Sequence, residues 1–166
     1  MCLLVLPSQI KLIRVLSGQT GCGKSFSMEG IAGDHDHKGI TPRAFEHIFQ
    51  HVSVEENAKF LVRASYLEIY NENIRDLLGK DPNAKLPLHE HPERGVYVKD
   101  LTLAVVHSVG EMVDMQIRGS KNRSVGATAM NADSSRSHSI FTVWLEVSEK
   151  GADGQEHIRA GKSLLH

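Results

Sequence analysis

One stretch of the sequence has the residue types and the spacing that bind phosphate groups. Its residues are Gly18, Gln19, Thr20, Gly21, Cys22, Gly23, Lys24 and Ser25, which fit the pattern G-x-x-x-x-G-K-[S/T]. The glycines allow a tight turn that directs backbone N–H groups into one concave anion site. Lys24 supplies a cation for the outer phosphates, and Ser25 supplies a hydroxyl for Mg²⁺. The stretch therefore predicts a nucleotide site, with a chance glycine-rich turn as the alternative.

The residues on either side of this loop supply the structural context that the motif requires. The apolar run 10–16 predicts a strand, and residues 25–29 predict the first turns of a helix. Lys11 and Arg14 interrupt the run, which is unusual for a central parallel strand that is buried on both faces. Strand, loop and helix in this order favour a true nucleotide site over the chance turn.

A second polar stretch is suited to act together with the first loop. In residues 131–138, Asn-Ala-Asp-Ser-Ser-Arg-Ser-His, every residue except Ala132 carries a hydroxyl, amide, carboxylate or basic group. The stretch lies between a predicted helix and a predicted strand at 139–148, in which apolar and polar residues alternate. A phosphate-loop protein needs a second loop that senses the terminal phosphate and completes Mg²⁺ coordination. The residue types suit that role, and a plain polar linker is the alternative.

Two further helices are predicted from their first residues and their apolar stripes. Thr41 as a cap and Pro42 at the first helical position predict the start of one helix. Its apolar stripe consists of Phe45, Ile48, Phe49 and Val52. A capping box over residues 108–111 predicts a second helix that runs to about residue 120. Its expected core face consists of Val109, Met112, Val113 and Ile117.

The sequence between these two helices predicts mainly strands and turns. We expect a strand at 60–70, which is apolar on both faces, and then a short helix at 71–78 that ends at Gly79. Further strands are expected at 86–89, 96–98 and 101–106. The charged segment 89–94 is as consistent with a solvated hairpin end as with a binding role.

Composition limits the class of protein. The chain has 166 residues, enough for one domain that buries about 70% of its unfolded surface. Its formal net charge is −1, so no overall field favours nucleic acid. Cys22 lies within the phosphate loop and Cys2 is the other cysteine, which indicates a reducing compartment rather than a disulfide framework. No run is long enough to span a membrane, and the short apolar start lacks the basic region of a secretory signal.

One cluster of histidines can be drawn as a metal site. His35, Asp36 and His37 are adjacent within the loop 31–39. Neighbouring loop residues rarely converge on one ion, because zinc sites use spaced nitrogen and sulfur donors. An exposed polar loop is therefore the favoured interpretation of this segment.

The motifs together resemble the motor domain of the kinesins. Residues 18–30 are similar to the kinesin phosphate loop, and 65–78, which begins Ser-Tyr-Leu-Glu-Ile-Tyr-Asn-Glu, resembles the strand-and-helix signature of that family. Residues 122–126 resemble the approach to its first switch, and 131–138 resemble the switch itself. The order of the motifs matches over residues 18–150, and the run is most similar to the intraflagellar-transport and neuronal homodimeric branch.

The resemblance implies a role for each matching residue. The backbone of residues 19–25 would bind the phosphates of ATP or ADP, with Lys24 at the outer phosphates, and Ser25 and Ser135 would hold Mg²⁺. The catalytic residues would lie in the switch and would be Asn131, Ser134 and Arg136. The first two would lie near the terminal phosphate and the attacking water, and the arginine would form the ion pair that closes the site.

The resemblance also implies a fold and a division of the chain. The expected fold is α/β, a P-loop NTPase of the kinesin-like kind with a central, mostly β sheet flanked by helices, and incomplete here. We expect a divergent N-terminal segment at 1–17, a partial motor domain at 18–158 and a divergent tail at 159–166. The second-switch motif of the family, Asp-Leu-Ala-Gly-Ser-Glu, does not occur in the sequence, so the carboxylate expected to pair with Arg136 is missing.

The implied function is that of an ATP-binding motor that moves along microtubules, or of a fragment of one. ATP hydrolysis, tubulin as the partner, and a place in the cytoplasm on the cytoskeleton, with the cilium as one candidate, follow from the resemblance. The alternative is a nucleotide-binding or non-catalytic kinesin fragment without motility. No nucleic-acid partner, membrane insertion or coiled coil is expected from this chain.

Overall fold

The structure, a computed structural model, describes residues 11–14, 19, 21–31, 33–54, 58–92, 95–129, 137–150 and 156–165. Three helices lie within these residues: α1 (Lys24–Glu29), α2 (Ile40–Val54) and α3 (Val109–Ala129). The first strands are β1 (Lys11–Arg14), β2 (Ala58–Tyr70), β3 (Asn73–Asp76) and β4 (Lys85–Leu86). The later strands are β5 (Leu88–His91), β6 (Gly95–Val98), β7 (Ala104–Val106), β8 (Ser137–Lys150) and β9 (Glu156–Leu165).

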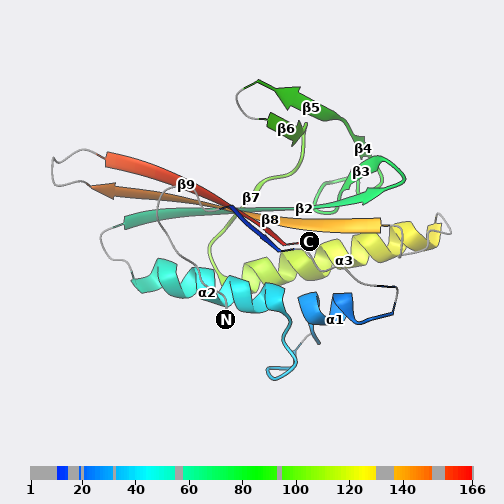
Figure 1. The fold of residues 1–166 in the computed structure, drawn as a ribbon, viewed down its shortest axis with the longest axis horizontal. Helices are drawn as coiled ribbons and strands as arrows, with labels where there is room; N and C mark the ends of the chain where they lie inside the picture. Colours follow the sequence, from blue (N-terminus) through cyan, green and yellow to red (C-terminus); the bar gives the residue numbers. More distant parts are fainter. Residues whose placement is uncertain are drawn as a thin grey trace.

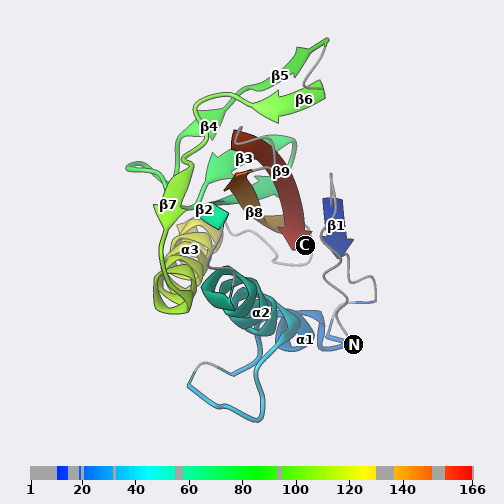
Figure 2. The same cartoon turned by 90° about the vertical axis from the view of Figure 1, so that its left-hand side faces the viewer.

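One large sheet organises the described part of the chain. Its order is β1-β9-β8-β2-β3-β4, and β7 pairs with β2 beside β3. The pairing of β1 with β9 is parallel and the others are antiparallel. All three helices lie on one side of this sheet, and the separate β5–β6 hairpin projects on the other side (Figures 1 and 2). The expected central, mostly β sheet flanked by helices is therefore confirmed.

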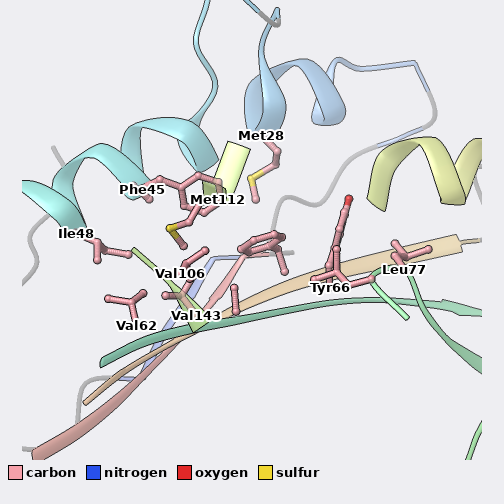
Figure 3. Packing of buried hydrophobic residues seen from close by; sticks show 13 residues of the cluster. Met28, Phe45, Ile48, Val62, Tyr66, Leu77, Val106, Met112 and Val143 are labelled. Atoms are coloured by element: carbon pink, nitrogen blue, oxygen red, sulfur yellow. The ribbon is translucent and has the colours of Figure 1, made fainter. Parts of the chain in front are cut away.

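The core lies between the sheet and the helices. Alternation along the two long central strands turns Val62, Ala64 and Tyr66 of β2 toward the helices, with Phe141 and Val143 of β8 beside them. Figure 3 shows Val62, Tyr66 and Val143 of the sheet on the side that faces the helices, where they belong to one buried cluster with residues of all three helices. The helix residues at this contact include Met28, Phe45, Ile48 and Met112. The predicted stripe of α2 is confirmed, because Phe45 and Ile48 are buried and Phe49 and Val52 pack against them.

The predicted helix at 71–78 is wrong. Asn71 and Glu72 have φ angles of 46° and 62° and form the two-residue turn of a hairpin between β2 and β3. Positive φ at both central positions matches the turn to the twist of the paired strands, and asparagine tolerates it well. Because no helix forms here, Gly79 ends none; it lies against the side chain of Asp76 instead.

The start of α2 lies two residues before the predicted start. The helix begins at Ile40, so Thr41 is its second residue and is buried rather than acting as the cap. The carbonyl of Gly39 accepts the backbone N–H of Arg43 at 3.5 Å. The cap position therefore belongs to Gly39, which leaves Pro42 within the first turn, where its missing N–H costs nothing.

The capping box that opens α3 is confirmed. Ser108 Oγ accepts a hydrogen bond from the N–H of Glu111 at 3.2 Å. The carboxylate of Glu111 reaches back and accepts the N–H of His107 at 2.8 Å. The bond to Ser108 satisfies one backbone donor that a helix start leaves without a carbonyl partner, whereas the bond from His107 holds the residue before the cap rather than the cap itself.

The remainder of α3 departs from the prediction in length and in the face that it buries. The helix continues to Ala129, and Ile117, which was expected in the core, is 49% exposed. The buried side runs instead through Met112, Met115 and Gly119 toward the Asn122–Arg123 pair. Arg123, which lies beyond the predicted end of the helix, is therefore within it and faces the sheet.

Candidate nucleotide-binding site and an adjoining polar cluster

The phosphate loop adopts the backbone conformation that its glycines allow. Gly21 and Gly23 have φ angles of 82° and 84°, in the left-handed region that other residues rarely adopt. The N–H of Cys22 donates to the carbonyl of Gln19 at 3.3 Å, which closes a tight turn. Of the predicted loop residues, Gly18 and Thr20 lie outside the described residues. The turn delivers the chain directly into α1, as the motif requires.

The two side chains with assigned chemistry lie at the start of α1. Lys24 is the first helical residue and Ser25, which is exposed, is the second. The ammonium of Lys24 donates to the carbonyl of Gln19 at 2.7 Å and lies 3.8 Å from the thiol of Cys22. The lysine charge is thus held over the loop itself. Met28 of the same helix is buried in the core, so the loop is attached to the sheet through α1.

This set of groups fits a chain of phosphates with Mg²⁺. The cap residue of α1 is Gly23, which has no side chain to accept hydrogen bonds from the N–H groups of the first turn. An anion is the natural partner of such amides, and Lys24 adds a full positive charge to the same place. The hydroxyl of Ser25 is an oxygen ligand of the kind that Mg²⁺ prefers.

The remaining predicted site residues belong to the second polar loop. Asn131, Ser134, Ser135 and Arg136 lie outside the described residues, so their roles stay predictions. The next residue along the chain, Ser137, is located. It begins β8 and pairs with Tyr70 at the end of the β2–β8 ladder.

Sequence reasoning missed a charged cluster beside this strand end. Glu68 of β2 is 2% exposed and forms ion pairs with Arg75 of β3 and Arg123 of α3. The guanidinium of Arg123 also reaches Ser137 and Ser139 of β8. We call Glu68, Arg75, Arg123, Ser137 and Ser139 the Glu68 cluster. The available signal was a glutamate within a strand predicted to be apolar on both faces.

Glu29 is the last residue of α1, and the charge of Arg123 in this cluster affects the pKa of its carboxyl. Burial raises the pKa of the Glu29 carboxyl above its ordinary value of 4.5, and the Arg123 charge opposes that rise. Burial also raises the pKa of Tyr66, while hydrogen bonds to Ser120 and Ser139 lower it. The helix that carries Lys24 and the strand that follows the second polar loop therefore share one electrostatic environment.

The raised pKa of Glu29 predicts a pH-dependent cost to folding. A carboxyl whose pKa is higher in the folded state favours folding while it is protonated, and that contribution is lost as the pH rises from 4.5 through the folded-state pKa. We expect Glu29→Gln to raise the melting temperature by about 1–3 °C at pH 7 and to have no effect below pH 4.5. Thermal melts across this range measure it, with the exposed Glu90→Gln as the matched control. A lower melting temperature at pH 7 would mean that attraction to Arg123 outweighs burial.

The histidine-rich loop has an internal explanation. The carboxylate of Asp34 lies 2.7 Å from Nδ1 of His37 and accepts the backbone N–H groups of Asp36 and His37. This closes the turn locally. In the described parts of the chain, no group of three or more histidine, cysteine, aspartate or glutamate side chains is placed to hold a metal ion.

None of the described helices is both long and apolar enough to cross a bilayer.

Comparisons with known proteins place these features in one family. The family model described as the kinesin motor domain matches residues 15–165. The chain is 52% identical over 148 residues to the kinesin-like protein KIF3C of Bos taurus and 53% identical over 148 residues to that of Mus musculus. Each alignment covers 89% of this chain, which spans only 19% of the length of these relatives. A solved structure of a fast kinesin matches with a TM-score of 0.85 at 41% identity, over 95% of this chain and 44% of that one.

Proposed function

Since the chain belongs to the kinesin motor-domain family, we propose that its phosphate loop binds ATP and ADP with Mg²⁺ as part of a microtubule motor. The observation that carries the proposal is the geometry at Gly21, Gly23 and Lys24. The left-handed glycines turn the chain into α1, and the lysine ammonium lies over the same loop. Lys24 would exchange the Gln19 carbonyl for phosphate oxygens, and Ser25 would ligate Mg²⁺.

Hydrolysis would require the second polar loop. We assign Asn131 and Ser134 to the terminal phosphate and the attacking water, Ser135 to Mg²⁺, and Arg136 to the ion pair that closes the site. The matching fast kinesin structure is described with an ATPase mechanism and with interactions with microtubules. Phosphoryl transfer depends mainly on positioning and electrostatic stabilisation, so these residues act only if the strand that follows them holds them in place.

The proposed partner surface includes the β5–β6 hairpin. It projects from the side of the sheet opposite the helices (Figure 1), and Leu88, Val96 and Tyr97 on it are 59%, 62% and 43% exposed. By resemblance this hairpin is a lesser part of the surface that faces tubulin. Tubulin as the partner implies that the protein is located in the cytoplasm on the cytoskeleton. We propose the cilium as the more specific location.

A second candidate function is nucleotide binding without motility. The face of the sheet opposite the helices carries apolar side chains from three strands, namely Leu61, Val105 and Ile158, which are 37%, 45% and 72% exposed. Exposed apolar area on a sheet face is typical of a surface that another element covers. Nucleotide binding of this kind needs the phosphate loop and does not need movement along a microtubule.

Direct titration with a fluorescent ADP analogue tests nucleotide binding, which both candidate functions require. We expect saturable binding that is tighter with Mg²⁺ than with EDTA, because Ser25 supplies a ligand to the ion. ATP turnover with and without microtubules then separates the two. Turnover that microtubules stimulate supports the motor, and binding without turnover supports the second candidate. The absence of saturable binding would contradict both.

A further inference from the structure

We propose that Arg123 is a positioning residue for the chain that enters β8, held in place by the buried carboxylate of Glu68. Arg123 touches no nucleotide in this proposal. It fixes Ser137, the residue directly after Arg136, and so sets the direction from which the second polar loop reaches the nucleotide. The inference rests on the proposed nucleotide binding, and its test separates the two.

The contacts of Arg123 join three elements through one rigid group. From α3, its Nε donates to Glu68 Oε1 of β2 at 3.3 Å. Its two terminal nitrogens donate to β8: Nη1 to Ser139 Oγ at 3.3 Å, and Nη2 to Ser137 at 3.2 Å (carbonyl) and 2.7 Å (hydroxyl). A guanidinium presents its donors in a fixed planar fork, so these bonds constrain one another.

Both carboxylate oxygens of Glu68 accept hydrogen bonds from arginine side chains. Its side chain is 3% exposed, and its second oxygen accepts from Arg75, whose side chain is 6% exposed. A buried carboxylate is tolerated when cations and hydrogen bonds compensate it, and removal of one partner leaves a costly charge. The cluster therefore resists rearrangement, and Arg123 is directed toward β8 by a carboxylate that cannot readily leave. Asn122 fixes the same turn of α3 by donating to the Leu77 carbonyl at 2.8 Å.

The position of these bonds distinguishes them from ordinary packing. Ser137 and Tyr70 form the last pair of the β2–β8 ladder, where a strand end would otherwise open most readily. Arg123 closes this end through the main chain and the side chain of Ser137. The same guanidinium acts electrostatically on Glu29 at the end of α1. It thus lies between the helix that carries Lys24 and the strand that the second polar loop enters.

Loss of Arg123 is expected to weaken the contacts of the second polar loop with the ligand and to leave those of the phosphate loop intact. Contacts of the phosphate loop with the nucleotide do not pass through Arg123, so binding of ADP without Mg²⁺ depends little on it. Contacts that the second polar loop makes with Mg²⁺ and the terminal phosphate do depend on it. Loss of Arg123 should therefore reduce the preference for Mg-ATP over Mg-free ADP rather than reduce all nucleotide binding equally.

The test compares Arg123→Gln and Arg123→Lys with the exposed Arg118→Gln of the same helix as the control. Fluorescent ATP and ADP analogues are titrated into the 166-residue chain, with Mg²⁺ or with EDTA. We expect Arg123→Gln to weaken Mg-ATP binding by about 10-fold, the size of one charge-assisted bond, with Mg-free ADP unchanged. Arg123→Lys keeps the charge without the fork and should give a smaller loss. Equal losses for both ligands, or no loss, would overturn the proposal.

Hydrogen exchange supplies a readout that does not require nucleotide. Arg123→Gln should accelerate amide exchange over residues 137–140 and leave 145–149, farther along β8, unchanged. Ser137→Ala, which removes only the acceptor at 2.7 Å, should act in the same direction and covers the case in which the arginine variant fails to fold. Unchanged exchange over 137–140 in both variants contradicts the positioning role. If the wild-type chain binds no nucleotide but exchange responds as expected, the proposed function fails and the positioning of β8 stands.

Discussion

Replacing Lys24 with alanine is expected to abolish most of the thermal stabilisation that Mg-ATP and Mg-ADP confer on the chain. A ligand at about 100 times its Kd stabilises a protein by about 2.7 kcal/mol, which corresponds to about 5–10 °C for a chain of this size. Lys24 places its ammonium over the loop, where it would contact the outer phosphates. Loss of a charge-assisted hydrogen bond costs about 1.5–3 kcal/mol, or a 10- to 100-fold weaker affinity.

The measurement is a thermal-shift series against nucleotide concentration at fixed Mg²⁺. Lys80→Ala is the matched control, because Lys80 is an exposed lysine far along the chain from the loop. The control should shift with nucleotide as the wild type does. Melting temperatures of Lys24→Ala that rise with nucleotide as steeply as those of the wild type would show that binding, if it occurs, does not use this loop.

Gly119→Ala is expected to destabilise the fold severely. A Cβ atom at position 119 would overlap Cδ1 and Cε1 of the Tyr66 ring and would lie 3.3 Å from its Cγ. Tyr66 cannot move away easily, because it is 3% exposed and its ring packs against Phe141 at a centroid distance of 5.2 Å. Overpacking of this kind costs about 1–3 kcal/mol and sometimes more, so we expect a fall in melting temperature of about 3–10 °C.

Gly110→Ala provides the control within the same helix. A Cβ there would meet only Ser108 Oγ, at 3.8 Å. Alanine is favoured over glycine in a helix by up to about 1 kcal/mol, so this variant should be as stable as the wild type or slightly more stable. The pair is compared by thermal and urea unfolding. If both variants were equally stable, the close packing of α3 on Tyr66 would be disproved.

These two experiments address different links between sequence and function. The lysine variant tests chemistry at the loop without touching the core. The glycine variant tests whether α3 lies against β2 closely enough for Arg123 to reach Glu68, since Gly119 lies one turn of the helix before Arg123. A folded Gly119→Ala chain with altered exchange over residues 137–140 would connect packing of the helix to the strand that follows the second polar loop.

Several features of this protein were determined by local sequence. The phosphate loop was predicted from eight consecutive residues, because glycines at fixed spacing determine which backbone angles are accessible. The stripe of α2 and the capping box of α3 were also found, since helical contacts repeat within a few residues. The two central strands were predicted because each carries its own alternation or apolar run, although β2 begins before its predicted start and β8 extends beyond both of its predicted ends.

Only the tertiary structure decided the features that depend on distant partners. Residues 71–78 carry apolar spacing that suits a helix, but the free edge of β2 paired with them and made β3. The last strand, β9, was not predicted, because its pairing with β8 and β1 supplies what its own sequence pattern does not. Arg123 and Glu68 are 55 residues apart, and nothing local marks them as partners. Local propensity sets which elements can form; pairing and burial across the sheet select among them and bring the charged cluster together.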